Sequence, residues 1–390
     1  MTGGDVPGAF RPPDYAGAHL LSDLVPAAAL GLGAGGVLDH GAADRARGLA
    51  LDVELRAAVV VLVDGLGERL LRARAAHTPF LRSLLPGTLS MSAGFPSTTA
   101  NSLSSLGTGL LPGSHGVMGY RLLDPSRDAV FNQLTWDPEV DPEAWVPDDT
   151  LFERVAAAGV DVVSLGEPKF AGRGLNQASL RGGRFRGSRS LSQRVDHAVQ
   201  ELRAPGRRLV YLYWGNLDKI GHGKGVDSWE WLEELEEIDR NLAELASSLG
   251  KDTGLFVTAD HGMVDVPHSG RTDIAEHPEL TTGLRGVGGE PRAVHLYARS
   301  GATADVAAAF AAESGDRARV LTRDRAVAEG WFGPVREENL GRLGDVIVVC
   351  GPGYGIVDSA HDSASSLGLI GHHGGVTPDE LEIPLLRVLG

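Results

Sequence analysis

The stretch that predicts the fold is AAVVVLVDGLG, residues 57 to 67. Its first seven residues are apolar and rich in β-branched side chains, which is typical of a strand buried on both faces of a parallel sheet. Asp64 follows the strand directly, and Gly65 opens a loop. Because ligands of open α/β sheets bind at the carboxyl ends of the strands, Asp64 lies where a ligand site is expected.

Three further apolar runs continue this pattern along the chain. They lie at 160–165, at 208–214 (RLVYLYW) and at 253–258 (TGLFVT). Helical segments separate them, among them residues 227–249, whose apolar side chains recur at steps of three and four. This alternation predicts an α/β fold of the alkaline phosphatase-like kind, with a central, mostly parallel sheet sandwiched by helices.

The order of these segments also suggests a division of the chain. Residues 1–55 are rich in Gly, Pro and Ala and are interpreted as an N-terminal lead-in. Residues 56–266 and 351–390 carry the motifs of the core. Between them, residues 267–350 are expected to form a smaller inserted α+β subdomain, with strands and helices in a βαβ-type order on the main sheet.

Composition limits the classes of function. The chain has 390 residues with a formal net charge of -15, which argues against a nucleic-acid scaffold because such proteins place cationic stripes against phosphate. One cysteine, Cys350, cannot form an internal disulfide. The first residues lack a basic start followed by an apolar run, and no stretch reaches the length of a membrane span. We therefore expect a cytoplasmic enzyme, and the oligomeric state stays open.

Carboxylates and histidines recur at predicted strand ends and in glycine loops. Asp218 and His222 are four residues apart, so one helical turn places them on the same face. Asp260-His261-Gly262 closes another strand, and His372-His373 lies in a glycine loop near the C-terminus. Each pair alone is compatible with a structural role, but the ends of parallel strands converge. The six candidate ligands are Asp64, Asp218, His222, Asp260, His261 and His373, a mixed oxygen and nitrogen set that suits zinc.

A cluster of hydroxyls lies in the stretch GFPSTTANS, residues 94–102. Ser97, Thr98 and Thr99 follow a proline and precede a predicted helical segment at 103–106. Alone, this pattern is typical of a helix N-cap. Next to six candidate metal ligands it becomes a candidate nucleophile loop, because a hydroxyl needs a metal or a base to become a good nucleophile.

The ordered set of motifs resembles the alkaline phosphatase superfamily. The motifs are Asp-Gly after the first strand, Phe-Pro-x-x-Thr, His-Gly, Asp-x-x-x-His, Asp-His-Gly and a terminal His-Gly. Within the superfamily the chain is similar to the nucleotide pyrophosphatase/phosphodiesterase branch, which is type I phosphodiesterase-like. The resemblance implies Thr99 as the nucleophile, three residues after Pro96 and nine before Thr108, with Thr98 as the fallback.

The resemblance also implies two Zn²⁺ per chain, although other divalent metals fit the same ligands. One zinc would be held by Asp64, Asp260 and His261 and would activate the threonine. The other would be held by Asp218, His222 and His373, with His372 as the fallback for the last ligand. The implied activity is that of a zinc-dependent phosphodiesterase or nucleotide pyrophosphatase, which hydrolyses a small phosphodiester or nucleotide-like substrate through a phospho-threonine intermediate.

Several alternatives stay open at this point. A phosphomonoesterase or a phosphonoacetate-like phosphonate hydrolase would use the same metals with a different pocket. A phosphoryl-alcohol transferase would use another acceptor, and a non-catalytic binding protein would need no turnover. Sulfatases of this superfamily need a Cys-x-Pro-x-Arg context, whereas Cys350 lies in CGPGY near the end of the chain.

Substrate contacts are the least specified part of the site. The branch usually has an Asn shortly after the His-Gly pair, whereas His115-Gly116 is followed here by Tyr120. Besides Tyr120, Asn101 in the hydroxyl-rich stretch is a candidate for substrate contact. The Arg-rich segment 169–194 is either a solvated loop or an arm that meets an anionic substrate, and Arg181 and Arg184 are its candidates.

Overall fold

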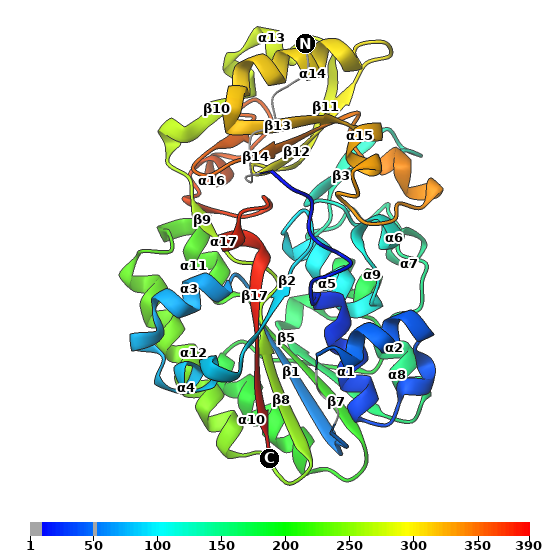
Figure 1. The fold of residues 1–390 in the computed structure, drawn as a ribbon, viewed down its shortest axis with the longest axis vertical. Helices are drawn as coiled ribbons and strands as arrows, with labels where there is room; N and C mark the ends of the chain where they lie inside the picture. The colour runs from blue at the N-terminus through cyan, green and yellow to red at the C-terminus, as the bar shows by residue number, and fades with distance from the viewer. Residues whose placement is uncertain (1–9, 50–52) are drawn as a thin grey trace.

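A computed structural model describes residues 10–49 and 53–390 of the chain. Parts of the predicted lead-in, residues 1–9 and 50–52, therefore lie outside the described residues. A seven-stranded sheet forms the lower part of the molecule in Figure 1, and a four-stranded sheet lies above it. The division into lead-in, core and insertion stays a prediction, but the two sheets are separate.

The large sheet has the order β2-β17-β8-β1-β7-β5-β6. The strands are β2 (Leu89–Ser92), β17 (Glu382–Leu389), β8 (Thr253–Thr258), β1 (Ala57–Val63), β7 (Arg208–Trp214), β5 (Asp161–Gly166) and β6 (Arg184–Gly187). Only β17 is antiparallel to its neighbours β2 and β8, while β8, β1, β7, β5 and β6 pair in parallel. The predicted mostly parallel sheet is therefore confirmed.

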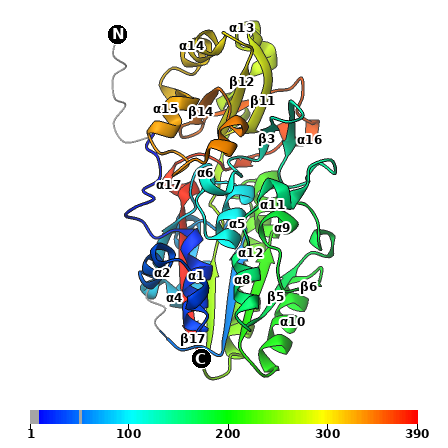
Figure 2. The ribbon, with the colours of Figure 1, turned by 90° about the vertical axis from the view of Figure 1, so that its right-hand side faces the viewer.

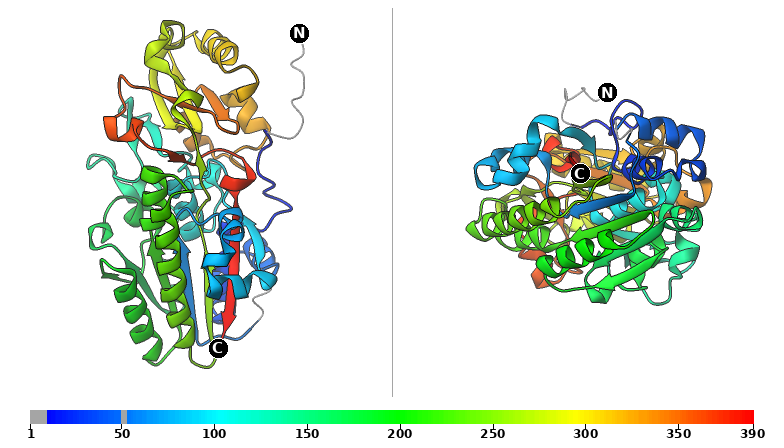
Figure 3. Two further views of the ribbon diagram at one scale, coloured as in Figure 1. Left: turned by 90° about the vertical axis from the view of Figure 1, so that its left-hand side faces the viewer. Right: turned by 90° about the horizontal axis from the view of Figure 1, so that it is seen from below.

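Helices cover both faces of this sheet, as Figures 2 and 3 show. One face carries α1 (Leu24–Gly31), α5 (Thr99–Thr108) and α8 (Leu151–Ala157). The other carries α4 (Pro79–Leu84), α10 (Leu191–Arg203) and α12 (Trp229–Ser247). The apolar stripe predicted for the long helix is buried in α12, from Trp231 to Leu245, because it faces the sheet. Among the described residues, no helix combines the length and apolar character needed to cross a bilayer.

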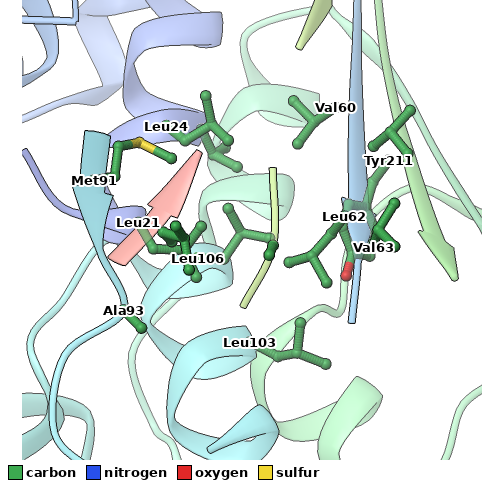
Figure 4. Packing of buried hydrophobic residues seen from close by; sticks show 14 of the residues in the cluster. Leu21, Leu24, Val60, Leu62, Val63, Met91, Ala93, Leu103, Leu106 and Tyr211 are labelled. Atoms are coloured by element: carbon green, nitrogen blue, oxygen red, sulfur yellow. The ribbon is translucent and has the colours of Figure 1, made fainter. Parts of the chain in front are cut away.

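Every residue of helix α5 is buried. Figure 4 shows Leu103 and Leu106 of α5 among the apolar side chains of the core, with Leu21, Leu24 and Leu62 nearby. Burying a leucine side chain contributes about 1.5–3 kcal/mol. The first turn of α5, which carries Thr99, is therefore anchored by the main core.

The smaller sheet has the order β11-β12-β14-β13, and all its neighbours are antiparallel. Its strands are β11 (Leu284–Glu290), β12 (Ala293–Ala298), β14 (Val346–Cys350) and β13 (Ala318–Thr322). Helix α14 (Thr303–Ser314) connects β12 to β13, so these two strands point the same way but are separated by β14. We expected a βαβ-type unit on the main sheet. The unit instead lies in a separate sheet, and β14 separates its two parallel strands, β12 and β13. The reason is that β14 is buried throughout and takes an inner position, whereas β13 is half-exposed.

Shorter elements complete the described chain. The helices are α2 (His40–Arg47), α3 (Glu68–Ala73), α6 (Pro112–His115), α7 (Pro142–Trp145), α9 (Gly174–Ser179), α11 (Asn216–Lys224), α13 (Pro278–Thr281), α15 (Arg323–Ala328), α16 (Ala364–Leu367) and α17 (Pro378–Leu381). The strands are β3 (Arg121–Asp124), β4 (Ala129–Asn132), β9 (Val264–Asp265), β10 (Arg271–Asp273), β15 (Gly355–Val357) and β16 (Gly371–His372).

A buried ion pair joins the smaller sheet to α17. Nε and Nη2 of Arg292 donate to the two carboxylate oxygens of Glu380 at 2.9 and 2.8 Å, and both side chains are fully buried. Glu380 also accepts from the N–H of Gly375, two residues after His373.

We expect Arg292→Ala to lower the free energy of unfolding by about 3–5 kcal/mol, because it leaves a buried carboxylate without its partner. Denaturant unfolding measures this effect. Arg47→Ala is the matched control, since Arg47 pairs with Asp44 on the surface, and surface pairs contribute about 0–1 kcal/mol. Equal losses for the two variants would contradict the prediction.

Candidate metal centre and nucleophile

Three parallel strands end at the same edge of the large sheet. Val63 of β1 pairs with Trp214 of β7, and Leu62 pairs with Thr258 of β8. The chain segments that follow these strands therefore begin next to one another. They begin at Asp64, at residue 215 and at residue 259. Gly65 has a φ of +75° and lies so close to α11 that an added Cβ would be 3.1 Å from the Asp218 Cβ. Glycine thus permits the close approach of α11 to the end of β1.

The ends of β1 and β8 form a first cluster of ligand atoms. Nε2 of His261 lies 3.4 Å from Oδ1 of Asp64 and 3.4 Å from Oδ2 of Asp260. The other oxygen of Asp260 accepts from the N–H groups of Gly65 and His261 at 3.1 and 3.0 Å. Within the described chain, Oδ1 of Asp64 and Oδ2 of Asp260 have no hydrogen-bond partner. Both unpartnered oxygens face the same imidazole nitrogen.

Helix α11 and the C-terminal glycine loop form a second cluster. Nε2 of His222 lies 3.4 Å from Oδ2 of Asp218, one turn earlier on α11. Nε2 of His373 lies 3.3 Å from Nε2 of His222 and 3.8 Å from Oδ1 of Asp218. The rings of His373 and His261 stack at 3.7 Å, so the two clusters are adjacent. Asp218 belongs to both, because its ligand atoms also lie within 4.8 Å of those of Asp64 and His261.

Backbone carbonyls orient all three imidazole rings. In each ring Nδ1 donates to a carbonyl, namely His222 to Gly371 at 2.8 Å, His261 to Gly262 at 2.9 Å and His373 to Ser97 at 2.9 Å. Because a carbonyl oxygen only accepts hydrogen bonds, Nδ1 carries the proton in each ring. Nε2 of the neutral ring then bears a lone pair, which points at the cluster. Two lone pairs 3.3 Å apart cannot hydrogen-bond to each other. Histidines that bind a metal through one ring nitrogen typically donate the other N–H to a carbonyl in this way.

The electrostatics of the cluster also favour a cation. Burial, together with the charges of Asp260 and Asp218, raises the pKa of Asp64 well above its ordinary value. Burial also raises the pKa of Asp260, and burial beside His261 and His222 lowers that of His373 well below its ordinary value. Carboxylates held this close disfavour their own ionisation unless a positive ion lies between them. The residues therefore fit divalent cations, and the mixed oxygen and nitrogen donors suit zinc.

The fallback ligand His372 is placed differently from His373. It lies in β16, which pairs with β9, and it belongs to neither cluster. Burial lowers the pKa of His372 to about 3.

Thr99 is the first residue of α5, and its Oγ1 lies 3.2 Å from Nε2 of His261. The helix begins four residues before the segment expected from the sequence, so Thr99 lies beside the free N–H groups and the positive end of the helix dipole. Ser97 ties this loop to the loop of His373, since its Oγ donates to the Gly375 carbonyl at 2.8 Å and accepts from the Gly374 N–H at 3.1 Å. The nucleophile candidate is thus held against both clusters.

Two cavities meet at Thr99. The aromatic-lined cavity, about 220 Å³, is walled by Leu103, Leu165, Leu175, Leu180, Phe170, Phe185, Tyr211 and Tyr213, together with the polar residues Asp64, Ser164, Glu167, Lys169, Arg173 and Asn176. The polar cavity, about 630 Å³, is walled by Thr98, Tyr120, Arg121, Asn132, Glu290, His361, Asp362, Ser363 and Ser366, together with His222 and His373. Thr99, Leu134, Asp218 and Lys219 line both. A phosphoryl group at Thr99 would therefore have a cavity on each side.

Of the expected substrate contacts, Tyr120 lines the polar cavity but Asn101 does not. Asn101 is fully buried, and its Nδ2 donates to the Pro96 carbonyl at 2.7 Å. The amide therefore holds the loop in front of Thr99 and points to protein, not to a cavity.

The Arg-rich segment contains α9 and the edge strand β6 and is not a free arm. Arg181 donates to the carbonyls of Ala178 and Asp148 at 2.6 Å each. Arg184 pairs with Asp161 and Glu201, at 3.0 Å each. Neither arginine lines a cavity beside Thr99, because local carboxylates and carbonyls take up their donors, whereas Lys169 and Arg173 of the same segment line the cavity of about 220 Å³ beside Thr99.

Two residues of the site were not anticipated. Tyr213 donates its hydroxyl to Oδ2 of Asp64, and Glu290 places a buried carboxyl in the wall of the polar cavity. An aromatic hydroxyl next to the end of β7 was a weak signal for Tyr213. The sequence around Glu290, GVGGEPRAV, contains no signal, because only the smaller sheet brings it to the site.

Fold and site together define an alkaline phosphatase-like α/β protein, with carboxylates and histidines at the strand ends and a threonine at a helix N-terminus. The chain belongs to the type I phosphodiesterase / nucleotide pyrophosphatase family, whose model matches residues 58–376.

Solved structures agree with this assignment. Human ectonucleotide pyrophosphatase / phosphodiesterase 5 superposes with a TM-score of 0.67 at 19% identity, over 84% of this chain and 87% of that one. The murine protein, in an inactive variant in complex with AMP, superposes with a TM-score of 0.69 over the same shares and at the same identity. This similarity establishes the fold.

Curated relatives match over shorter stretches. An uncharacterized pyrophosphatase/phosphodiesterase of Schizosaccharomyces pombe is 26% identical over 203 residues, which is 50% of this chain and 39% of that protein. The bis(5'-adenosyl)-triphosphatase enpp4 of Xenopus laevis is 29% identical over 174 residues, 41% of this chain and 36% of that protein. A phosphopentomutase of Anaeromyxobacter dehalogenans is 32% identical over 149 residues, 37% of this chain and 35% of that protein. The matched regions thus span little more than a third of these relatives.

Proposed function

We propose that the chain is a metal-dependent phosphodiesterase of the nucleotide pyrophosphatase type, with Thr99 as its nucleophile. The observation that carries the proposal is the position of Oγ1 of Thr99. It lies 3.2 Å from Nε2 of His261, at the N-terminus of α5 and beside both ligand clusters. A hydroxyl in this position has metal ligands on one side and helix N–H groups on the other, which is what attack on a phosphoryl group requires.

Six side chains would hold two cations. Asp64, Asp260 and His261 would hold one, and Asp218, His222 and His373 the other, with zinc favoured by the donor set. When bound, two such ions supply positive charge that lowers the pKa of a hydroxyl and balances the charge on the transferring phosphoryl group. The carbonyls of Gly262, Gly371 and Ser97 keep each imidazole in the tautomer that can bind a metal.

The chemistry on the chain takes two steps. Oγ1 of Thr99 loses its proton to solvent and forms a bond to phosphorus, and the bond from phosphorus to one alcohol breaks. The alcohol leaves with a proton from water, and Thr99 carries the phosphoryl ester. A water molecule then attacks phosphorus, the bond to Oγ1 breaks, and Thr99 regains its proton. The N-terminus of α5 stabilises the phosphoryl oxygens in both steps.

The names of relatives support this proposal. The murine phosphodiesterase 5 structure with AMP is described as inactive through a threonine-to-alanine change. A bis(5'-adenosyl)-triphosphatase is among the matched proteins. The first points to a reaction that depends on a threonine, and both point to a nucleotide-like phosphoester.

A substrate panel on zinc-loaded protein tests the proposal. We expect bis-p-nitrophenyl phosphate to be hydrolysed with a kcat/KM at least about tenfold above that of p-nitrophenyl phosphate or phosphonoacetate, a difference of about 1.4 kcal/mol in transition-state stabilisation. A preference for the monoester or the phosphonate would reassign the chain to those hydrolases. Feeble hydrolysis that rises steeply with added alcohol acceptors would indicate a transferase, and no bound metal would indicate a binding protein.

A further inference from the structure

Glu290, the last residue of β11, places a carboxyl in the wall of the polar cavity. Its side chain is only 6% exposed. Oε2 accepts from the N–H of Tyr120 at 2.9 Å, whereas Oε1 has no hydrogen-bond partner among the described residues. On its other side, Glu290 packs against Gly374, where an added Cβ would lie 2.5 Å from the Glu290 Cγ. The carboxyl is thus held rigidly between the Tyr120 loop and the loop that carries His373.

Oε1 of Glu290 is buried without a hydrogen bond, which is unfavourable, and a ligand that donates a hydrogen bond to it would remove this cost. Leaving a buried polar atom without a hydrogen bond is unfavourable by about 1–3 kcal/mol. Burial raises the pKa of Glu290 to about 8, and the Tyr120 N–H and the nearby Thr98 hydroxyl act in the opposite direction. The Thr98 hydroxyl lies near this carboxyl, but it makes no hydrogen bond of good geometry to Oε1. A hydrogen-bond donor that arrives in the cavity would satisfy Oε1 and would favour the charged carboxylate if the donor is a cation.

The charges around the cavity determine which donors fit. Arg121 already pairs with Asp362 at 2.8 Å. His361 pairs with Asp358 at 2.7 Å. These two basic groups of the wall are therefore balanced by carboxylates of their own. Lys219, which lines both cavities, has no ion pair among the described residues, and neither has Glu290. Once the Glu290 carboxyl is ionised, above a pH of about 8, an anionic group beside it would be repelled, whereas a hydroxyl or an ammonium group would find an acceptor.

We infer that Glu290 is a specificity-determining residue that accepts a hydrogen bond from a hydroxyl or ammonium group on one alcohol of a phosphodiester. The inference rests on the proposed function and narrows its substrate class. The aromatic-lined cavity on the other side of Thr99 takes one alcohol, and the polar cavity takes a donor-bearing, non-anionic one. Diesters of polyols or amino alcohols therefore fit better than substrates that place a further phosphate in the polar cavity.

The test uses four p-nitrophenyl diesters of nearly equal size, in which the second group is propyl, 2-hydroxyethyl, 2-aminoethyl or 2-carboxyethyl. For the zinc-loaded wild-type chain, assayed about one unit above the Glu290 pKa of about 8, we expect kcat/KM for the hydroxyethyl and aminoethyl diesters to exceed that of the propyl diester by about tenfold, the effect of one good polar contact. The carboxyethyl diester should fall below the propyl diester. Ratios between substrates do not depend on the fraction of folded enzyme.

Two substitutions separate charge from hydrogen bonding. Glu290→Met should bring all four values of kcat/KM together, because it removes the acceptor. Glu290→Gln should abolish the aminoethyl preference and the discrimination against carboxyethyl, while part of the hydroxyethyl preference survives. Glu313→Gln is the matched control, since Glu313 pairs with Arg317 and lines neither cavity beside Thr99. It should leave all ratios unchanged.

The outcomes are distinct. Wild-type ratios near one, or ratios that Glu290→Met leaves unchanged, overturn the inference while the phosphodiesterase activity stands. No turnover of any of the four diesters overturns the proposed function and the inference with it.

Discussion

Thr99→Ala is expected to reduce kcat/KM on a phosphodiester by at least about 10³-fold, as removal of a covalent nucleophile does in other enzymes. Oγ1 of Thr99 is the hydroxyl that lies 3.2 Å from Nε2 of His261, and its removal leaves the ligand side chains in place. The metal content of the purified variant, measured by elemental analysis, should therefore equal that of the wild type. Turnover is lost while the metal centre is kept.

Two variants make this result specific. Thr99→Ser retains the hydroxyl and should retain part of the activity. Thr108→Ala removes a threonine hydroxyl at the other end of α5, where it donates to the Ser104 carbonyl, and should leave kcat/KM unchanged. Wild-type activity of Thr99→Ala on bis-p-nitrophenyl phosphate would remove Thr99 from the mechanism and leave Thr98 as the hydroxyl to test.

Removal of the metal with a chelator is expected to abolish turnover and to lower the melting temperature by several degrees. Asp64, Asp218 and Asp260 each have a buried oxygen without a hydrogen-bond partner in the described chain. A cation that binds the folded chain alone stabilises it by about 4 kcal/mol when its concentration is 1,000 times the Kd. Thermal unfolding with and without chelator measures the loss, and added Zn²⁺ should restore both stability and activity.

The matched pair of variants for this prediction is His222→Ala and His77→Ala. His222 belongs to the second cluster, so its removal should leave about one bound zinc per chain instead of two. His77 pairs with Glu236 on the surface, and its removal should change neither zinc content nor melting temperature. A chelator-treated chain that keeps its turnover and its melting temperature would contradict a functional metal centre.

The main sheet and the positions of the candidate ligands could be predicted because they follow from short-range patterns. A run such as 57–63 has no polar side chain, so it can only be a strand buried on both faces, and the residue after it must lie at a strand end. The helix that carries Asp218 and His222 follows from the same kind of local rule, a spacing of four residues. The carboxyl ends of parallel strands lie at one edge of a sheet, so a parallel sheet is enough to bring these residues together. The structure contains such a sheet.

The inserted region was less predictable, because strand order in a sheet is not written in the spacing of residues along the chain. Val346–Cys350 and Ala318–Thr322 are both plausible strands, but the more completely buried one inserts between its neighbours. The Arg-rich segment illustrates the same limit. Its arginines are a local pattern, whereas Asp161 and Glu201, which neutralise Arg184, come from neighbouring elements of the fold.

By itself, the sequence determined the family, the class of fold and the set of carboxylates, histidines and hydroxyls from which a phosphoryl-transfer site can be built. The tertiary structure alone decided which of them meet: Thr99 beside His261, His373 rather than His372 in the cluster, and Asn101 turned into the protein. It also brought Tyr213 to Asp64 and Glu290 to the polar cavity. The physical reason is range, since periodicity and capping act over a few residues. The contacts of Thr99, Tyr213 and Glu290, in contrast, join segments more than a hundred residues apart.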